Sequence, residues 1–461
     1  MKACHSIVPV FDDPNLVSAA GLVPVLELAG RAGLDGLLAE HLSVPSANAA
    51  DKSRSVVAGM LAGADSIDDL DLLRAGGMAR VVPGVRAPST LGTFLRTFTH
   101  GHVQQVDKIS GAVLAGLTGQ VPGLLAGGRA QDGMVFIDVD DTIRAVHGYA
   151  KQGAGFGYSR VRGLNVQLAT ACTPTSAPVV VRARLRRGNI ASHKGSARLL
   201  AQAITTTRAA GASGRVLARA DSAYYLRAFL ATAVRHDAWF SVTARMNPQV
   251  VGAIAAINQD AWTSIHYPNA VFDEQAGGWV SDAQVAEVPF TAFTSLPKAQ
   301  QITCRLVVRR VKRQQPRASD GSVQGELFAD WRHHAFVTNS TLSTVEADQR
   351  HRDHAIIEQV IAELKDGPLA HLPSGNYAAN AAWVAFAALS FNLARAASIA
   401  AGMVTARWAT LRRRIITVPA RLAATGRRLV LHLPARWPWA PAWAALWATI
   451  TATGPPTPAT T

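Results

Sequence analysis

The chain has 461 residues, which is enough for two to four domains with a large hydrophobic core. Hydrophobic residues make up 49% of it, as in a globular protein. It carries 46 Lys and Arg against 31 Asp and Glu, a formal charge of +15. Such a surplus favours a polyanionic partner, most often nucleic acid. A high-GC genome, in which Arg codons are frequent, would produce the same surplus.

The cysteines and the apolar runs exclude several protein classes. Cys4, Cys172 and Cys304 lie far apart, without a CxxC pair, so no disulfide framework is expected. This usage suits a reducing cytoplasm. The first residues lack the apolar core of a signal peptide. No uninterrupted apolar run reaches the roughly 20 residues of a membrane span. We therefore expect a cytoplasmic protein with no membrane partner.

Residues 1–130 are predicted to be mostly helical. Apolar residues recur at helical spacing within 15–42, 66–73, 90–98 and 103–117, with breaks at Gly30 and Gly33. Small helices in a basic protein are compatible with a DNA-binding domain. They are equally compatible with a helical packing domain, because no sharp helix-turn-helix signature is present.

From residue 131 the pattern changes to alternating strands and helices. Strands are predicted at 134–140, 163–172, 177–185, 216–220 and 239–243, with helices at 192–210 and 224–235. Three adjacent strands followed by helix, strand, helix and strand are the element order of an RNase H-like fold. The predicted fold class is therefore α/β, and 131–245 form the first part of an RNase H-like catalytic core.

The rest of the chain divides into three predicted regions. Short strand-like runs separated by turn residues indicate a β-rich insertion at 246–342. Residues 343–402 complete the core with a helix at 350–366 and a long apolar helix at 378–402. Residues 403–461 form a basic, Trp-rich region that ends in a Pro-Thr-Ala tail predicted to be disordered.

Two strand ends carry carboxylates. The strand at 134–140 ends in three acids, and alternation places Asp138 and Asp140 on one face. A buried carboxylate is costly unless it is paired or binds a metal. Asp221 follows the fourth strand, and catalytic groups of α/β folds collect at such ends. Asp221 would also suit a helix cap. Both roles are compatible.

The helix at 350–366 presents a polar stripe. His351, His354, Glu358 and Lys365 fall within a sector of about 60° on an ideal helix, and Glu358 borders the apolar face. Glu363 points away from Glu358. The stripe is compatible with a core-facing acid, and equally with a solvated surface helix.

These residues carry a family resemblance over about 133–400. The chain resembles the DDE transposases of bacterial insertion sequences, in the branch with a Tyr-x2-Arg-x3-Glu-x6-Lys signature and a β-rich insertion before the Glu helix. Asp140 in Asp-Asp-Thr matches the first acid, Asp221 in Arg-x-Asp-Ser the second, and Glu358 with Lys365 the Glu-x6-Lys spacing. Asp138 and Asp141 remain alternatives to Asp140.

The signature is not complete. Its Tyr falls on His351 and its Arg on His354. The resemblance implies that this helix contacts DNA phosphate, so His351, Arg352, His354 and Lys365 are the expected DNA-binding residues. A histidine can hydrogen-bond a phosphate but is largely neutral at pH 7.

The resemblance also implies a function. A bacterial, nucleoid-associated transposase would bind the terminal inverted repeats of its element as a homodimer in a synaptic complex with double-stranded DNA. It would cut and rejoin DNA with two Mg²⁺ ions held by Asp140, Asp221 and Glu358, with Mn²⁺ as a substitute. The alternatives are an RNase H-like nuclease without strand transfer, or an inactive DNA-binding protein descended from a transposase.

Overall fold

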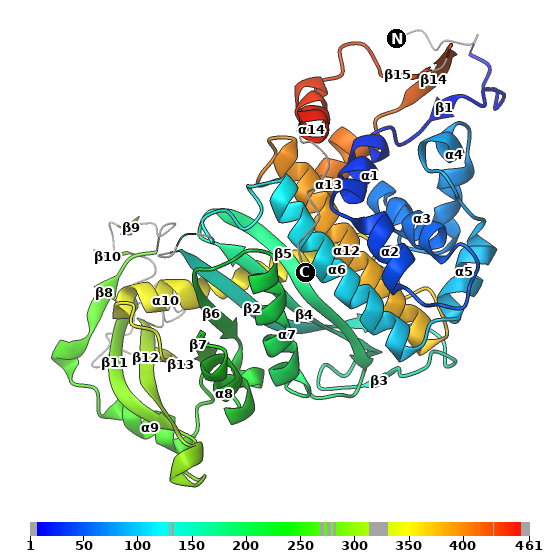
Figure 1. Cartoon of the computed structure of the whole chain (residues 1–461). Helices are drawn as coiled ribbons and strands as arrows, with labels where there is room; N and C mark the ends of the chain where they lie inside the picture. Colours follow the sequence, from blue (N-terminus) through cyan, green and yellow to red (C-terminus); the bar gives the residue numbers. More distant parts are fainter. Residues whose placement is uncertain are drawn as a thin grey trace, which may run out of the picture.

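The computed structural model describes residues 7–128, 130, 133–267, 272–273, 278–279, 283–312, 331–426 and 428–452. A helical region, a central sheet and a β-rich insertion follow one another across the molecule (Figure 1). The predicted α/β class is confirmed at this level.

The central sheet is built from five of the predicted strands. They are β2 (Met134–Ala145), β4 (Arg162–Thr173), β5 (Ser176–Arg187), β6 (Arg215–Ala220) and β7 (Trp239–Thr243). Their spatial order is β5-β4-β2-β6-β7. β2, β6 and β7 are parallel, whereas β4 is antiparallel to both β2 and β5. Hence the C-terminal ends of β2, β5, β6 and β7 point to the same edge of the sheet.

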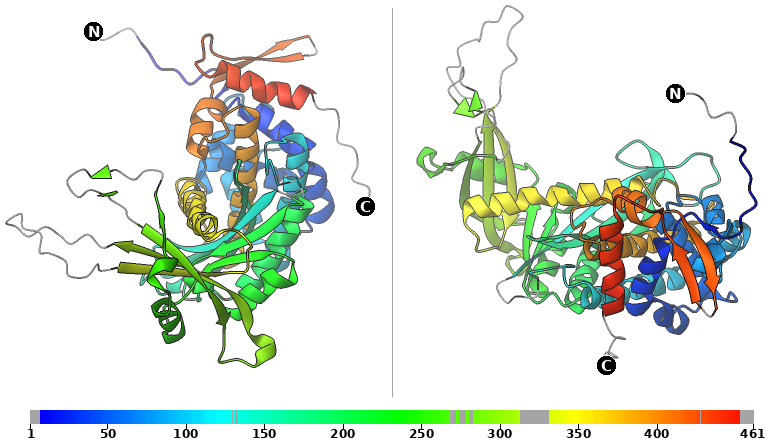
Figure 2. Two further views of the ribbon diagram at one scale, coloured as in Figure 1. Left: turned by 90° about the vertical axis from the view of Figure 1, so that its left-hand side faces the viewer. Right: turned by 90° about the horizontal axis from the view of Figure 1, so that it is seen from above.

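Helices cover both faces of this sheet, which explains why its strands are apolar runs. α7 (Ser196–Ala209) and α8 (Arg227–Arg235) lie on one face, and α11 (Ile356–Lys365) lies on the other (Figures 1 and 2). Phe136 on β2 packs in a small cluster with Ile356 of α11, whereas Ile137 and Val139 belong to the main core. The alternation along β2 therefore points Phe136 and Asp138 toward α11.

The insertion continues the central sheet. Its strands β8 (Thr263–Ile265), β11 (Ala283–Ala292), β12 (Ile302–Lys312) and β13 (Trp331–Thr338) follow α9 (Pro248–Ala255). β13 pairs with β7 in antiparallel register, with Val337 opposite Val242. β11 and β12 then extend the sheet outward to β8, and β9 (Phe272–Asp273) pairs with β10 (Gly278–Trp279) apart from it.

The helix predicted at 350–366 is broken, which corrects the expectation of a continuous helix. α10 (Thr344–Arg352) ends at a 3₁₀ turn, η5 (Asp353–Ala355), before α11 begins. The carbonyl oxygen of Arg350 accepts a hydrogen bond from Arg219 Nη1 at 2.7 Å. In a regular helix this oxygen would accept from the amide of residue 354. The break therefore coincides with a side-chain contact from the sheet.

The N-terminal helices pack around α12 (Tyr377–Ala400). They are α1 (Leu22–Arg31), α2 (Leu34–His41), α3 (Ala49–Ala62), η1 (Asp68–Arg74), α4 (Met78–Val81), α5 (Pro88–Arg96) and α6 (His100–Gln120). α12 is long and apolar enough to cross a membrane, but 94% of its most apolar window is buried inside the protein. It is therefore the core helix of this region. The sequence interpretation missed α3.

The C-terminal region folds back beside the N-terminus. It comprises α13 (Trp408–Leu411), a π-helical turn η6 (Arg412–Ile416), β14 (Ala420–Thr425), β15 (Arg428–His432) and α14 (Ala440–Ala452). β1 (Leu16–Val17) pairs with β14, so a strand opens the segment that was predicted to be helical from residue 15. The Pro-Thr-Ala tail, 453–461, lies outside the described residues.

Candidate metal centre

Asp140 and Asp221 are neighbours at one edge of the sheet. β2 and β6 are parallel, with Val139 opposite Ala220, and each acid is the next residue along its chain. The apolar runs before them build the strands, and the two carboxylates follow where burial of those strands diminishes. The sequence-predicted first and second acids are therefore brought together.

The environment of both carboxyls disfavours their charged forms. The pKa of Asp140 is raised to about 6, mainly by burial and also by the negative charges of Asp221 and Asp141, whereas the Asp141 amide and His354 act to lower it. Burial of the carboxyl also raises the pKa of Asp221, although the residue as a whole is exposed. Asp221 Oδ1 accepts a hydrogen bond from the amide of Ala223 at 3.0 Å, which caps η2 (Ser222–Tyr224). The capping role and the position beside Asp140 therefore coexist.

Asp138 is fully buried in an ion-paired cluster. Its Oδ1 accepts from Arg219 Nε at 2.6 Å and its Oδ2 from Arg219 Nη2 at 2.8 Å. His354 Nδ1 lies 2.9 Å from Oδ1. Although burial opposes ionisation, Arg219 and His354 hold the pKa of Asp138 below its ordinary value. Both oxygens are occupied, so Asp138 is a structural acid and not a free ligand.

Asp141 is occupied as well. On the opposite face of β2 its Oδ2 forms an ion pair with Arg186 of β5 and accepts from Asn165 Nδ2 at 2.9 Å. Its Oδ1 accepts from Ser192 Oγ at 3.1 Å. β2 continues to Ala145, so the three acids lie within the strand and not at the end predicted at residue 140. Of the three, only Asp140 has no ion pair with Arg, Lys or His among the described residues.

Glu358 lies on α11, between two basic residues that act on Asp140. His354, four residues earlier, and Lys365, seven residues later, both favour the charged form of Asp140. Burial and the nearby Arg144 lower the pKa of Lys365. Residues four and seven apart share one face of a helix. Glu358 is exposed on that face, but its carboxylate is not close enough to Asp140 and Asp221 for a three-ligand metal group within the described chain.

The expected DNA-binding residues have different surroundings. Both ring nitrogens of His351 face hydroxyls, with Nδ1 2.8 Å from Ser241 Oγ and Nε2 3.1 Å from Thr243 Oγ1. Its ring stacks on Phe336 at 4.1 Å, and burial lowers the pKa of His351 to about 3. These contacts favour packing between α10 and the insertion, so a phosphate contact of His351 would require them to break.

Arg352, His354 and Lys365, the other expected DNA-binding residues, lie on α10, η5 and α11. Arg352 donates to Asp348 Oδ2 at 2.9 Å and lies over the ring of Tyr267. His354 uses Nδ1 on Asp138, and Lys365 is half-buried beside Asp140. Their contact with DNA stays a prediction.

Sequence reasoning did not anticipate that Arg219 and Arg186 pair with the acids Asp138 and Asp141. Arg219 precedes Asp221 by two residues, and Arg186 is the penultimate residue of β5. A signal for Arg219 was present, because alternation places it on the same face of β6 as Asp221, just as Asp138 shares a face with Asp140. The sequence showed no signal for Arg186, because its pairing depends on the order of β5 and β4 in the sheet.

The donor set suits a divalent cation. Asp140 and Asp221 are neighbouring carboxylates, and the negative charge of Asp221 raises the pKa of Asp140. Arg219 and Arg186 are bound to Asp138 and Asp141, so Lys365 is the remaining cation that acts on Asp140. A hard cation such as Mg²⁺ prefers carboxylate oxygens and would supply the missing positive charge.

Comparison with known proteins agrees with this geometry. No match to a curated protein was found. A family model described as "Transposase DDE domain group 1" matches residues 2–455, nearly the whole chain. The match includes the N-terminal helices and the C-terminal region in addition to the stretch that carries the acids. The chain therefore belongs to the family of DDE transposases.

Proposed function

We propose that the chain binds the terminal inverted repeats of a bacterial insertion sequence and, with Mg²⁺, catalyses DNA strand cleavage and strand transfer. Asp140, Asp221 and Glu358 are the proposed metal ligands on an RNase H-like core. The strand order β5-β4-β2-β6-β7, with only β4 antiparallel to its neighbours, supports that core assignment.

One observation carries the proposal. Asp140, within β2, and Asp221, directly after β6, lie side by side on neighbouring parallel strands, and both have a raised pKa. Folding selects against such a pair unless a ligand or a reaction needs it. The acids on either side, Asp138 and Asp141, are each neutralised by an arginine. The contrast indicates that the uncompensated pair is retained for a cation.

The chemistry assigns separate tasks to the residues. When bound, divalent metal ions polarise the phosphodiester and provide a nucleophile at neutral pH. Asp140 and Asp221, as ionised carboxylates, would hold the cations, and Glu358 would complete the set of metal ligands from α11. Lys365, half-buried beside Asp140, is placed to contact a phosphate oxygen near the cut. Strand transfer by a DNA 3′-OH requires no Ser or Tyr nucleophile on the protein.

Cleavage of the element's own ends tests the proposal. Purified protein is incubated with Mg²⁺ and a DNA duplex that carries the terminal repeat, and nicked products are resolved on a denaturing gel. Wild type cleaves, whereas Asp140→Asn, Asp221→Asn and Glu358→Gln lose cleavage by at least about a hundredfold, as expected for loss of charge stabilisation in the transition state. Asp366→Asn, at an exposed acid that ends α11, is the matched control and keeps activity.

Two outcomes would change the assignment. Persistent metal-dependent cleavage in all three variants would refute the triad. A second substrate with a pre-cut 3′-OH end separates strand transfer from simple nuclease activity. Salt-dependent DNA binding without cleavage in Mg²⁺ or Mn²⁺ would instead identify an inactive DNA-binding descendant of a transposase, the alternative that His351 and His354 raise.

A further inference from the structure

The residues between the two strand-end acids form a stretch without negative side chains. From 142 to 220 the sequence contains no Asp or Glu and 13 Lys or Arg. The formal charge of the whole chain is +15, so this stretch supplies most of the surplus. Codon bias toward Arg does not remove acids from 79 consecutive residues. Some of these cations pair with carboxylates inside the protein, as Arg186 and Arg219 do, so the exposed and unpaired ones are those that can serve a partner.

The two long loops of this stretch meet beyond Asp140 and Asp221, in the direction in which β2 and β5 run. One loop follows β2 and includes the two-residue strand β3 (Gly155–Phe156), which pairs with the start of β4. The other follows β5. The amide of Gly188 donates to the carbonyl of Gly153 at 3.0 Å, so the loops contact each other. β2 ends five residues after Asp140, about 17 Å further along the strand.

The loop after β2 exposes three aromatic rings. Tyr149 is 96% exposed, Phe156 67% and Tyr158 106%. Burying one large side chain contributes about 1.5–3 kcal/mol to folding, so most aromatic residues are at least partly buried. Three exposed rings within ten residues form an apolar surface, and such surfaces commonly mark interaction sites.

Cations alternate with these rings. Arg162 lies over the ring of Tyr149, 5.6 Å from its centroid, and donates to the Tyr149 carbonyl at 3.1 Å. Arg160 is exposed in the same loop, and Arg187 and Lys194 are exposed beside it. Within the described chain none of these four cations forms an ion pair with a carboxylate. The surface combines aromatic faces with uncompensated positive charge.

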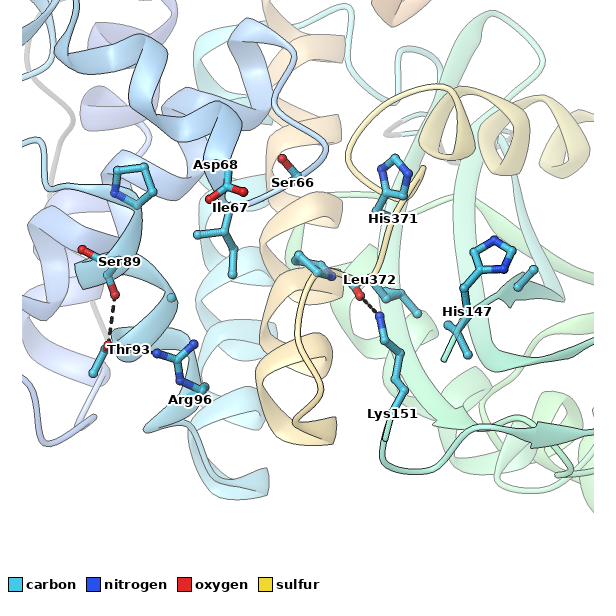
Figure 3. Close-up of a pocket in the computed structure, with 15 residues that line it drawn as sticks. Ser66, Ile67, Asp68, Ser89, Thr93, Arg96, His147, Lys151, His371 and Leu372 are labelled. Atoms are coloured by element: carbon cyan, nitrogen blue, oxygen red, sulfur yellow. Dashed lines mark hydrogen bonds between the residues drawn. The ribbon is translucent and has the colours of Figure 1, made fainter. Parts of the chain in front are cut away.

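A cavity of about 640 Å³ adjoins the loop on the side of the N-terminal helices. Figure 3 shows Arg96 on one wall, and His147 and Lys151 on the opposite wall. His371 lines it as well and pairs with Asp65 at 2.9 Å. Asp68 is the one carboxylate among the lining residues. The cavity therefore continues the basic surface from the loop toward α5.

We propose that the loop of residues 147–162 is a stacking platform for an unpaired DNA strand beside the cleavage site. Stacking on an aromatic ring requires a free base face, and in a duplex the neighbouring bases cover both faces. Phosphate contacts alone would need cations but no rings. The mixture of rings and cations therefore fits a frayed or displaced strand better than an intact helix. This inference rests on the proposed function, because it assumes that the protein cuts DNA at the metal centre of Asp140 and Asp221.

Binding of a forked DNA tests the platform without catalysis. In EDTA, the affinity of the full chain is measured by fluorescence anisotropy for a duplex with an unpaired arm and for a fully paired duplex of the same length. Replacing Tyr149, Phe156 and Tyr158 together by Ala weakens binding of the forked DNA by at least about tenfold, because each stacked base contributes on the order of 1–3 kcal/mol. Affinity for the paired duplex changes by less than about twofold, because phosphate contacts dominate there.

Two controls separate stacking from loss of fold. The double variant Tyr149→Phe, Tyr158→Phe keeps the rings and retains the affinity for forked DNA. Phe11→Ala removes another fully exposed ring, outside the loop, and leaves both affinities unchanged. A 2-aminopurine placed in the unpaired arm loses fluorescence on binding to wild type and keeps it with the triple variant.

The result also distinguishes this inference from the proposed function. Equal weakening on both DNAs, or no weakening on either, overturns the platform; in the second case the loop would have to serve another partner, such as an acidic protein. Cleavage of the terminal repeats by wild type and not by Asp140→Asn would still support the metal centre. If Asp140→Asn cleaves DNA as well as wild type does, while the triple variant still binds forked DNA weakly, only the enzymatic proposal is refuted.

Discussion

Arg219 and Asp138 form a two-pronged ion pair inside the sheet, with nitrogen–oxygen distances of 2.6 and 2.8 Å. The pair connects three segments, because Arg219 also donates to the carbonyl of Arg350 and Asp138 also contacts His354. Asp138 lies two residues before Asp140, Arg219 two before Asp221, and His354 four before Glu358. Each proposed metal ligand is thus anchored to the same buried cluster.

Loss of Arg219 is expected to destabilise the protein strongly. Arg219→Met leaves Asp138 buried without its main partner, which costs about 3–5 kcal/mol of unfolding free energy. Arg215→Met is the matched control on the same strand, because its pair with Asp237 is exposed and worth at most about 1 kcal/mol. Urea denaturation followed by circular dichroism measures both values. Similar losses for the two variants would contradict the role assigned to Arg219.

Two glutamates on α11 are expected to behave oppositely. Glu363 is buried, with Oε1 3.2 Å from Arg395 Nη2 and Oε2 accepting from the amide of Trp408 at 2.7 Å. Glu363→Gln therefore lowers the unfolding free energy by about 2–4 kcal/mol and leaves cleavage intact where the protein is folded. Glu358→Gln, at an exposed position, changes stability by less than about 0.5 kcal/mol and abolishes cleavage. Denaturation and cleavage assays on both variants check that one substitution affects stability and the other affects cleavage.

Neutralising Asp140 is expected to stabilise the metal-free protein. The folded chain holds the pKa of this carboxyl at about 6, above its ordinary value of 3.8, so ionisation at pH 7.5 disfavours the folded state. Asp140→Asn removes that cost and raises the unfolding free energy by on the order of 1–2 kcal/mol.

The same variant should lose its response to metal. A cation that binds only the folded state raises the unfolding free energy, by about 2.7 kcal/mol at a hundred times its Kd, and the melting temperature rises with it. We expect Mn²⁺ to raise the melting temperature of wild type and of Asp366→Asn, and to raise that of Asp140→Asn much less. Differential scanning fluorimetry measures the shift, and an undiminished shift in Asp140→Asn would place the metal elsewhere.

His351 is expected to make the protein sensitive to mild acid. Its pKa is lowered from 6.5 to about 3, so below pH 6.5 the unfolded chain binds a proton that the folded chain does not. The unfolding free energy therefore falls as the pH drops from 6.5 toward 4, by up to about 1.4 kcal/mol per pH unit. His351→Gln retains hydrogen-bonding groups but does not titrate, so its stability should depend less on pH across this window. Denaturation curves at pH 7, 6, 5 and 4 provide the comparison.

The sequence allowed Asp140 and Asp221 to be placed together, because each follows an apolar run that can only be a buried strand. It left Asp138, Asp140 and Asp141 as alternatives, because their difference lies in partners from other strands. Arg219 contacts Asp138 from the adjacent strand β6, and Arg186 contacts Asp141 from β5, two strands away. No local pattern specifies such pairs.

The break between α10 and α11 was also beyond local reasoning. Residues 350–366 have strong helical periodicity, and the turn at 353–355 arises where the sheet contributes a hydrogen bond to the carbonyl of Arg350. Helix α3 was missed for a different reason: it is rich in Ala, Ser and Val and has only a weak amphipathic pattern. Its burial against the other helices of the core decides its structure.

The pairing of β13 with β7 has a mechanical consequence for the insertion. Since the sheet runs unbroken from β5 to β8, the insertion cannot swing as a hinged lobe without tearing backbone hydrogen bonds that hold Ser241 and Val242 in place. DNA that touches both the outer strands and the acids would meet a rigid frame of fixed span.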